Sequence, residues 1–563
     1  MCDWGHGKTA EGMMKTERVQ TDVLCIGGGI AGLMAAIRAS ELGAKVVVAE
    51  KGVTKYSGSA RAGNDHFWCY IPEIHGPDVD LIIKESRITQ KGPVMAMLGT
   101  AFLRTWLKKT LDIIKLWDEW GIPMRNNGRW ELSGHAFPGR PVTHLKYRGF
   151  NQKPVLMEQA LKRGAKIMDR TMVYDLLADE GGIRGAVGVD TREDTFVEFE
   201  AKSVILTTGT IGRVYPNAVP ELMGNNTRPF TLTGDGRAMA WRAGADLLNM
   251  EMVNRHAGIK NYCRSGQGSW IGVCRDPSGV PVGKYVTKPE RDYGDIIIEV
   301  DKSIFERYLQ SGKGPIYMDC RGISEADHAY LMTGLEHEGN LGLLQHFKDE
   351  GIDLRKNPVE FMTYELRSSG MIRINEKGET TVKGLYAAGE ESMFSISGAS
   401  VFGWISGENA AHYAKSKDLR GGMKMAAHVE SLKNQIEAIQ DRSHGPDWKD
   451  ANIALNHTLS DYAGLVRSES LLNAGLTHLR RLKQTVQQTM MARTRWELVR
   501  CIEVLNLFDL GELVFLAALD RKESRGLHHR ADFPYTDPLL NDKLHVARKE
   551  GETTTIRWED APR

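Results

Sequence analysis

Residues 21–51, TDVLCIGGGIAGLMAAIRASELGAKVVVAEK, decide the fold of the largest part of this chain. Residues 23–26 are predicted to form a buried strand, and Gly27, Gly29 and Gly32 form a GxGxxG turn that leads into a helix. A second apolar strand, VVVAE, ends at Glu50, which follows Gly32 by 18 residues. This order of strand, glycine turn, helix, strand and acidic residue predicts a dinucleotide site of the Rossmann type.

Each part of this segment has its own physical task. Gly27 permits the tight turn, Gly29 lets a pyrophosphate approach the backbone, and Gly32 lets the helix pack closely on the strand. The N-terminus of the helix stabilises the phosphate charge, and Glu50 accepts hydrogen bonds from a ribose diol. The segment therefore predicts an α/β fold with a bound dinucleotide.

The overall composition narrows the class of protein. A chain of 563 residues is too long for one core, so two to four domains are expected. Lys and Arg number 73 against 72 Asp and Glu, which argues against nucleic acid or a membrane surface as the main partner. The seven cysteines are scattered without a CxxC motif, so we expect no disulfide framework, zinc site or iron–sulfur cluster in this chain.

The sequence also predicts where the protein works. No apolar run reaches the roughly 18 residues that a membrane-spanning helix needs, so direct insertion into a membrane is not expected. The first residues, MCDWGHGKTAEGMMKTER, lack the hydrophobic core of a signal peptide. We therefore expect a cytoplasmic location, either free or beside a membrane through a partner protein.

The pattern along the chain predicts four parts. Residues 95–120 are predicted to form an amphipathic helix, and GGIRGAVGVDTREDTFVEFE (181–200) has the pattern of a β-hairpin. The stretch from about 255 to 365 is irregular and rich in Gly, Pro and charge, whereas VKGLYAAGEES (382–392) returns to the strand-and-glycine pattern. Residues 425–522 are helix-periodic with few Gly or Pro, and the last forty or so residues show little periodicity.

We therefore predict a Rossmann-type dinucleotide-binding domain that is discontinuous, with an inserted α+β capping domain and a C-terminal helical domain. The predicted boundaries are 1–254 and 366–424 for the binding domain, 255–365 for the capping domain, 425–522 for the helical bundle and 523–563 for a C-terminal tail.

Several motifs carry a resemblance to one family. GGGIAGLMAAIRAS, AKSVILTTGTIGRVY, TGDGRAMAWRAGA, NMEMVNRH, VKGLYAAGE and ESRGLHHRADFP, in this order, resemble the flavoprotein subunits of succinate dehydrogenase and fumarate reductase. L-aspartate oxidase and adenylylsulfate reductase are relatives in that family. The run GKGPIYMDC (312–320) and the stretch around 240–256 look most like the adenylylsulfate reductase branch.

The resemblance implies that the dinucleotide is FAD. It also implies that the helix beginning near Ile405 and Ser406 points its N–H groups at the flavin, where its dipole would stabilise negative charge on the reduced ring. Succinate dehydrogenases attach FAD to a histidine of the loop that corresponds to KYSGSARAGN (55–64), which has none, and His66 just beyond is interpreted as non-bonding. FAD is therefore expected to be non-covalent. The implied cofactor-binding residues are Gly27, Gly29, Ala31, Gly32, Glu50, Lys51, Ser57, Gly58, Ala62, Gly63, Val173, Thr208, Gly209, Asp235, Gly389, Glu390, Ser400, Ile405 and Ser406.

The substrate pocket departs from the family pattern. The dicarboxylate enzymes use an arginine in an SRD-type motif as proton donor, but here that motif is Tyr293-Gly294-Asp295. The arginine that clamps a carboxylate in the family is replaced by Val401, and the second histidine is missing from TYELRSSGMIRI (363–374). We expect a largely apolar, aromatic pocket with Trp270, Val401, Phe402 and Trp404 as walls. Such a pocket cannot stabilise two desolvated carboxylates.

The remaining polar residues of this region are the catalytic candidates. His256, in NRHAG, matches a family histidine, and either His256 or Tyr364 is a candidate general acid or base. Arg367 or Arg275 is a candidate to orient an anionic group, and Arg255 is a further polar candidate near the flavin face. For each residue the alternative is a purely structural role, as a core histidine or a salt-bridging arginine.

The leading functional hypothesis is an FAD-dependent oxidoreductase that acts on a small molecule other than a dicarboxylate, such as an unsaturated or aromatic acid derivative or a sulfur oxyanion. Its electrons would pass through a separate, ferredoxin-like iron–sulfur protein, or oxygen would reoxidise the flavin. One alternative is an electron-transfer flavoprotein subunit without a substrate of its own. Another is a fumarate-type reductase with relocated arginines. The sequence leaves the oligomeric state open, and no metal site is predicted.

Overall fold

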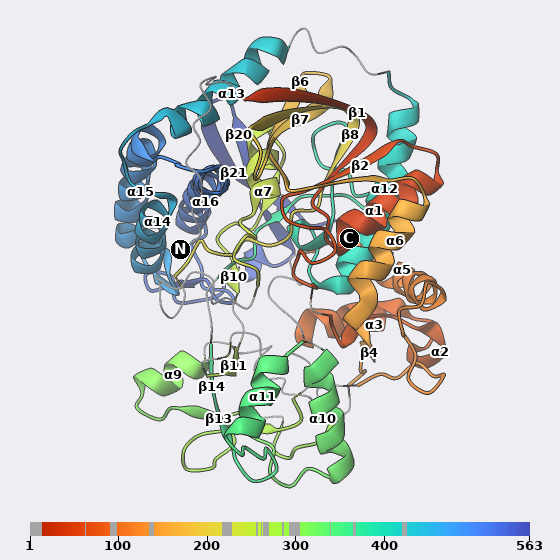
Figure 1. Cartoon of the computed structure of the whole chain (residues 1–563). Helices are drawn as coiled ribbons and strands as arrows, with labels where there is room; N and C mark the ends of the chain where they lie inside the picture. Colours follow the sequence, from red (N-terminus) through yellow and green to blue (C-terminus); the bar gives the residue numbers. More distant parts are fainter. Residues whose placement is uncertain are drawn as a thin grey trace.

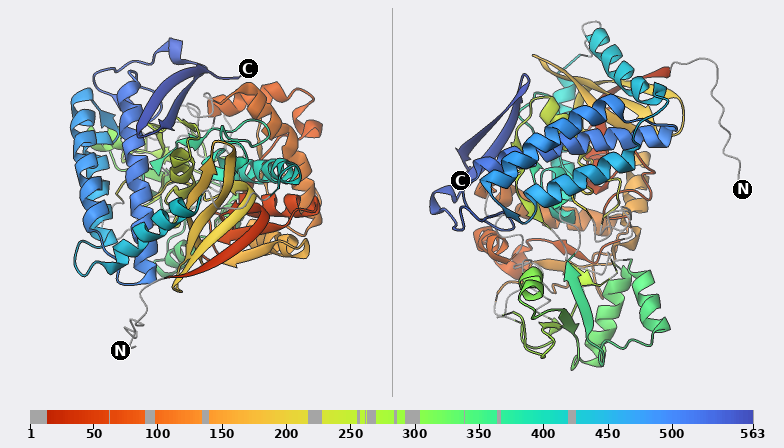
Figure 2. Two further views of the ribbon diagram at one scale, coloured as in Figure 1. Left: turned by 90° about the horizontal axis from the view of Figure 1, so that it is seen from above. Right: turned by 90° about the vertical axis from the view of Figure 1, so that its left-hand side faces the viewer.

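The computed structural model shows a large body to which a smaller unit is attached below (Figure 1). The body combines a central sheet with a bundle of helices along one side, and both views of Figure 2 show the bundle packed against the sheet-bearing part. The structure describes residues 14–61, 63–89, 98–133, 140–216, 228–254, 257–260, 262, 270–283, 286–291, 304–337, 339–363, 367–418 and 425–562.

The central sheet contains the predicted Rossmann unit. β1 (Lys15–Ile26), α1 (Ile30–Glu41) and β2 (Val46–Glu50) follow one another as the glycine pattern predicts. β1 lies between β2 and β8 (Thr195–Leu206) and pairs in parallel with both, and β5 (Lys166–Asp169) extends the sheet beyond β2. The α/β fold class is therefore confirmed.

The antiparallel half of the same sheet is the predicted hairpin region. β6 (Thr171–Asp179), β7 (Gly182–Asp190) and β8 pair in antiparallel succession, in the order β5-β2-β1-β8-β7-β6. β17 (Leu385–Ala387) pairs in parallel with β8, so residues on both sides of the insertion share one sheet.

Helix α12 (Ser395–Lys415) packs along α1 on one face of the sheet. A Cβ atom at Gly403 would lie 2.5 Å from the Ala31 carbonyl oxygen, so this position needs glycine for the two helices to approach. The prediction that this helix begins near Ile405 and Ser406 is wrong, because it begins ten residues earlier at Ser395. The small residues of SISGAS (395–400) suit tight helix packing as well as a loop, which hid the start.

The inserted unit has a core of its own. β11 (Ala257–Ile259), β14 (Val359–Thr363), β13 (Ile316–Asp319) and β12 (Val273–Arg275) form an antiparallel sheet in that order. Helices α9 (Ile304–Gln310), α10 (Glu325–His337) and α11 (Leu341–Asp349) belong to the same unit. Apolar side chains from both layers, including Met318, Leu331 and Phe361, are buried together.

The helix-periodic segment folds as a bundle. Its helices are α13 (Ala426–Asp441), α14 (Trp448–Ala463), α15 (Glu469–Thr489) and α16 (Arg495–Asp520). Their apolar faces join the hydrophobic core that lies under β6–β8, so the bundle and the antiparallel half of the sheet share one interior. Within the described ranges, no helix combines the length and the hydropathy needed to cross a bilayer.

The expectation of a C-terminal tail needs correction. β20 (Lys543–Glu550) and β21 (Thr553–Asp560) form a hairpin, and β20 also pairs with β9 (Leu247–Leu248). β16 (Met371–Ile372) pairs with the other side of β9, which completes a sheet of four strands. Charged residues stand at both ends of KLHVARKE and obscured this strand, although the four residues 544–547 in its middle are buried.

The remaining elements surround these units. They are β3 (His66–Trp68), α2 (Pro72–His75), α3 (Val79–Thr89), α5 (Thr100–Glu119), β4 (His144–Lys146), α6 (Gln152–Lys162), α7 (Asp235–Arg242), β10 (Val253–Asn254), β15 (Arg367–Ser368), β18 (Val466–Arg467) and β19 (His529–Arg530). The helix predicted over 95–120 is α5, which starts after Gly99.

Candidate functional site

A cavity of about 450 Å³ lies at the carboxyl ends of the parallel strands. This is the edge of an open α/β sheet where ligands usually bind. Its lining runs from Glu50, at the end of β2, to His66 and His144 on the β3–β4 ribbon. Figure 1 shows β4 much closer to the inserted unit than β2 is. The cavity therefore extends from the Rossmann turn toward the junction of the two units.

The glycine turn has the geometry that its sequence requires. Gly27 has a φ of +106°, and a Cβ there would lie 2.5 Å from the Thr207 carbonyl oxygen. A Cβ at Gly32 would lie 1.9 Å from the Gly27 carbonyl oxygen, so α1 and β1 could not pack with a larger residue. Gly29 precedes the first turn of α1 and lines the cavity, which leaves the helix N-terminus open to an anionic group.

Glu50 is buried beside this turn. One carboxylate oxygen accepts a hydrogen bond from the Gly28 N–H at 2.7 Å, and the other accepts from the Gly52 N–H at 2.7 Å. Each carboxylate oxygen has two lone pairs, so the group can still accept bonds from a ribose diol. The position and chemistry of Glu50 therefore fit the adenosine end of FAD.

Lys51 lines the cavity, but its ammonium is engaged with other protein groups. Its Nζ lies 2.7 Å from an Asp235 carboxylate oxygen and 2.6 Å from one of Glu503, which is fully buried on α16. Arg213 and Arg500 contact the other oxygen of Glu503 at 2.9 and 3.0 Å. We call these five residues the Lys51 network. It joins the Rossmann turn to the helical bundle.

Sequence reasoning found Lys51 and Asp235 but missed the other members of this network. A signal was present, because Arg500 and Glu503 interrupt the apolar run LVRCIEVLNLF (498–508). Charged residues inside such a run are rarely buried without partners.

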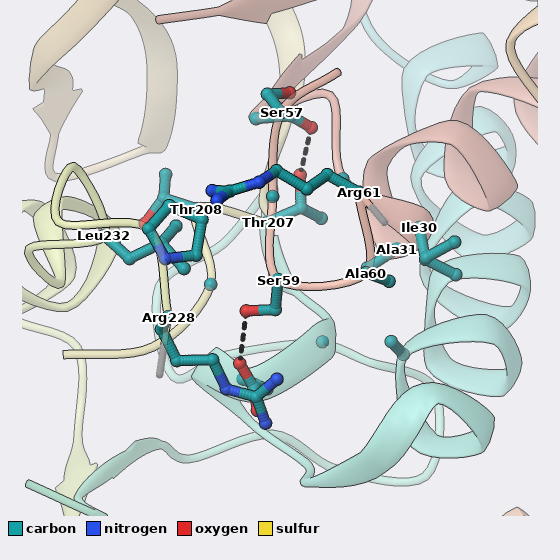
Figure 3. A pocket seen from close by; sticks show the side chains of 18 of the residues that line it. Ile30, Ala31, Ser57, Ser59, Ala60, Arg61, Thr207, Thr208, Arg228 and Leu232 are labelled. Atoms are coloured by element: carbon teal, nitrogen blue, oxygen red, sulfur yellow. Dashed lines mark hydrogen bonds and ion pairs between the residues drawn. The ribbon is translucent and has the colours of Figure 1, made fainter. Parts of the chain in front are cut away.

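The loop 57–61 faces Glu390 across the cavity. Ser59 Oγ donates to one Glu390 carboxylate oxygen at 3.1 Å, and Arg228 contacts the other at 3.4 Å. Figure 3 shows this loop between Ile30 and Ala31 on one side and Thr208 and Leu232 on the other. Ser57 Oγ and Arg228 Nε have no acceptor among the described residues. A cofactor with many oxygen acceptors, such as FAD, fits these buried donors.

Arg237 fixes the backbone around the same cavity. Its fully buried guanidinium donates to the carbonyl oxygens of Gly370 at 2.6 Å, Gly209 at 2.7 Å and Glu390. Burial lowers the pKa of Arg237 to about 10, and the neighbouring Glu391 and Glu390 charges oppose that shift. Three loops that line or flank the cavity are thereby held together.

Two further buried groups were missed by sequence reasoning. Lys153 is 1% exposed, lines the cavity and donates to the Gly28 carbonyl oxygen, and burial lowers its pKa to about 8. Glu391 is fully buried and accepts a hydrogen bond from Thr208 Oγ1. Burial raises the pKa of Glu391 to about 7. No local pattern distinguishes these two from surface residues.

Most of the predicted cofactor residues line the cavity. They are Gly27, Gly29, Ala31, Glu50, Lys51, Ser57, Gly58, Gly63, Val173, Thr208, Gly209, Asp235, Gly389 and Glu390. Gly32, Ser400, Ile405 and Ser406 are not among the lining residues. Ser400 and Ser406 are buried on α12 and donate to the backbone carbonyls of Ile396 and Ala387. Ala62 lies outside the described residues.

The predicted catalytic residues are placed only in part. Arg255, His256 and Tyr364 lie outside the described residues. Arg367 belongs to β15, where its backbone pairs with Asn254 of β10, directly before residues 255–256. Arg275 forms an ion pair with Asp319 at 3.0 Å in the inserted sheet and does not line the cavity.

The four residues that were expected to form the walls of the pocket do not line the cavity. Trp270 packs edge-to-face on Phe361 in the core of the inserted unit. Phe402 stacks on Phe102 at 4.4 Å, and Val401 and Trp404 are buried in the core around α12. None of the three lines the cavity, whereas Ser395, Ile396 and Ala399 in the first turns of α12 do.

Most of the chain matches two protein-family models. Residues 22–403 match the model described as "FAD binding domain", and residues 452–561 match "Fumarate reductase flavoprotein C-term". The chain is similar to one subunit of the fumarate reductase (CoM/CoB) of Methanothermobacter marburgensis, with 29% identity over 95% of this chain and 98% of that protein. It is 24% identical to the fumarate reductase flavoprotein subunit of Escherichia coli, over 78% of each chain.

Comparison with solved structures shows the same fold. Adenylylsulfate reductase from Archaeoglobus fulgidus superposes with a TM-score of 0.85 at 21% identity, covering 98% of this chain and 97% of the other. A chain of E. coli quinol fumarate reductase superposes with a TM-score of 0.82 at 21% identity, covering 97% of both chains.

Proposed function

Because this chain belongs to the FAD-binding flavoprotein family of fumarate reductase and is an FAD-dependent oxidoreductase, we propose that its substrate is not a dicarboxylate. The observation that carries this proposal is the lining of the cavity near the inserted unit. His66, Trp68, His144, Ala257, Ile396 and Ala399 lie there. The cations of the described lining are Arg61, Arg228, Lys51 and Lys153. Arg228 is paired with Glu390, and Lys51 is paired with Asp235 and Glu503. Lys153 donates to the Gly28 carbonyl oxygen beside the glycine turn.

Two desolvated carboxylates need several cations around them. The sequence has Gly294 in place of the family's proton-donating arginine and Val401 in place of its clamp. Val401 is also fully buried in a core and does not line the cavity, so even an arginine there would have to displace packed side chains. Rings and small apolar groups instead favour a flat, uncharged or singly charged substrate.

The residues around the cavity suit FAD held without a covalent bond. Bound FAD supplies or accepts a hydride at its isoalloxazine ring. Glu50 would bind the ribose, and the N-terminus of α1 would bind the diphosphate. Ser57 and Arg228 would bind oxygen and nitrogen atoms of the cofactor beyond the diphosphate. No histidine occurs within residues 55–64, and His66 Nδ1 bonds to Asp65 at 2.6 Å. Acid denaturation should therefore release all of the flavin into the soluble fraction.

A separate protein is proposed as the electron partner. The relatives are named as subunits, which indicates that they work within larger complexes. The chain has one dinucleotide fingerprint and scattered cysteines, so an iron–sulfur protein is the proposed source or recipient of electrons. We also propose that this complex works in the cytoplasm, free or beside a membrane.

The test uses the holoprotein under anaerobic conditions. Its flavin is reduced with dithionite, and fumarate is then added while the flavin absorbance is followed. We expect that fumarate does not reoxidise the flavin, whereas an uncharged α,β-unsaturated carbonyl compound does. Rapid reoxidation by fumarate would overturn the proposal and show that other arginines supply the dicarboxylate site.

A further inference from the structure

The β3–β4 ribbon places several functional side chains on one face. Successive residues of a strand point to opposite sides, so His66 and Trp68 share a face that excludes Phe67. The antiparallel register sets Lys146 opposite His66 and His144 opposite Trp68. Residues directly opposite each other lie on the same face of a ribbon. His66, Trp68 and His144 line the cavity.

The three rings form a continuous wall. The Trp68 and His144 rings lie 5.5 Å apart with an interplanar angle of 31°, and the His66 and His144 rings lie 5.5 Å apart with an angle of 59°. Ala257 of the inserted unit and Ile396 of α12 line the same cavity. A wall of ring faces with apolar neighbours suits a planar, conjugated molecule.

Trp68 carries a buried donor without an acceptor. Its side chain is 3% exposed, and the indole Nε1–H has no hydrogen-bond partner in the part of the chain that the structure describes. The indole N–H can only donate, and leaving a buried donor unpaired is unfavourable. An acceptor oxygen on a molecule bound in the cavity would satisfy it.

His66 is oriented by a buried carboxylate. Asp65, which is 2% exposed, contacts His66 Nδ1 at 2.6 Å with one oxygen and Lys146 Nζ at 2.6 Å with the other. Lys146 is 8% exposed and lies 5.7 Å from the Tyr330 ring of the inserted unit. A carboxylate on Nδ1 fixes the tautomer and ring orientation and directs proton exchange to Nε2.

We propose that this face is the substrate site, that Trp68 donates to a carbonyl oxygen, and that His66 is the acid–base residue for an α,β-unsaturated carbonyl compound. This inference rests on the proposed function, because it names the substrate class of the same site. The carbonyl oxygen of such a compound would accept a hydrogen bond from the Trp68 N–H, and its conjugated plane would lie against the three rings. The His66 imidazole would transfer the single proton that the reaction needs. Asp65 and Lys146 are positioning residues, since they act through His66.

The reaction balances with these groups. In the reductive direction the C=C π bond would break, one carbon would receive a hydride from the reduced cofactor, and the other would receive the proton from His66 Nε2. The substrate would gain two electrons and two hydrogens, both electrons arriving with the hydride, and the His66 imidazole would be left neutral until it takes a proton from water. Trp68 stabilises negative charge on the carbonyl oxygen while the bonds change.

The experiment uses benzylideneacetone, an uncharged conjugated enone, as the probe. Its dissociation constant is measured with the oxidised holoprotein from the change in the flavin spectrum, which needs no turnover. Its rate of reoxidising the dithionite-reduced flavin is measured separately by stopped flow. The variants are Trp68→Phe, His66→Gln and His66→Ala, and the matched control is His412→Gln on the exposed side of α12. The flavin content of every variant is checked first.

We expect Trp68→Phe to weaken binding about five- to tenfold, as the loss of one buried hydrogen bond does. His66→Gln should leave the dissociation constant within about twofold but slow reoxidation by about 100-fold or more, which is typical of losing an acid–base group. Added imidazole should restore part of the rate in His66→Ala, a response that a structural role would not give. His412→Gln should match the wild type in both measurements.

Several outcomes would overturn the inference. Equal reoxidation rates for His66→Gln and His412→Gln would remove His66 as the acid–base residue. An unchanged dissociation constant in Trp68→Phe would remove its donor role. If benzylideneacetone neither shifts the flavin spectrum nor reoxidises the reduced flavin, the substrate class is wrong. Rapid reoxidation by fumarate instead refutes the proposed function, whatever the His66 variants show.

Discussion

Replacing Glu503 by Gln should lower both the stability of the protein and its affinity for FAD. Glu503 is fully buried on α16 and is the shared anion for Lys51, Arg213 and Arg500, at distances of 2.6 to 3.0 Å. The substitution keeps the shape of the side chain but leaves the cations with Asp235 as their remaining anionic neighbour in the network.

The magnitude follows from the burial of these groups. Removing one partner from a buried ion pair costs about 3–5 kcal/mol, because the remaining charge stays desolvated. For a chain of this length that unfolds cooperatively, the entropy of unfolding near the midpoint is about 1.2 kcal/mol/K, so the melting temperature should fall by about 3 °C. Lys51 also lines the FAD cavity, and we expect about a tenfold weaker affinity for FAD, equivalent to about 1.4 kcal/mol.

The assay compares melting curves and FAD titrations of the apoprotein, followed by flavin fluorescence quenching. Glu512→Gln is the control, since Glu512 lies on the same helix but pairs with the half-exposed Arg480 and with Lys483, which keeps Asp509 as a second partner. The pair with the exposed Arg480 should contribute no more than about 1 kcal/mol. Equal shifts in the two variants, with the wild-type affinity for FAD retained in Glu503→Gln, would refute the view that the network connects the bundle to the cofactor site.

Three other changes have expected results. Gly32→Ala should abolish FAD retention, because its Cβ would lie 1.9 Å from the Gly27 carbonyl oxygen, and purified protein without flavin absorbance would show it. Burial raises the pKa of Glu391 to about 7 from 4.5, so the folded state holds this proton more tightly than the unfolded state. Titration of this group alone should therefore cost about 3 kcal/mol of stability as pH rises from 4.5 to 7. Denaturation curves across that range should show a smaller loss of stability for Glu391→Gln than for the wild type. Lys153→Met should gain stability at neutral pH relative to pH 10, because burial lowers the pKa of Lys153 to about 8 and penalises its charged form below that pH.

The local part of the site could be predicted from the sequence. Gly27, Gly29 and Glu50 stand within one strand–helix–strand unit, whose spacing by itself determines where each residue lies. The same holds for the helix-periodic bundle, whose four helices fall within residues 425–522. In both cases the pattern and the structure depend on the same short-range geometry.

The non-local part could not be predicted. The pairing of Lys51 with Glu503 joins residues 452 positions apart, and no spacing rule connects them. The walls of the pocket were misplaced for a related reason. The predicted start of α12 near Ile405 left residues 395–399 outside the helix, whereas Ser395, Ile396 and Ala399 lie in its first turns and line the cavity.

His66 shows a third kind of difficulty. Its position just after the flavin loop is visible in the sequence, but the sequence supports only the interpretation that it forms no covalent bond. Its neighbour Asp65 and the facing Lys146 become relevant only through the register of two three-residue strands that lie far apart in the chain. Strands this short carry no alternation from which pairing can be inferred.

The C-terminal hairpin has a consequence for how the protein is made. β20 pairs with β9 and β21 pairs with β20, and the Pro562 carbonyl accepts a hydrogen bond from the Thr100 N–H at 3.1 Å. A ribosome adds about 5–20 residues per second, so the Rossmann turn emerges on the order of a minute before its last structural neighbours. The edge of β9 that β20 covers stays unpaired until β20 emerges, about 295 residues later in the chain. A stalled ribosome would hold a chain whose first domain is incomplete.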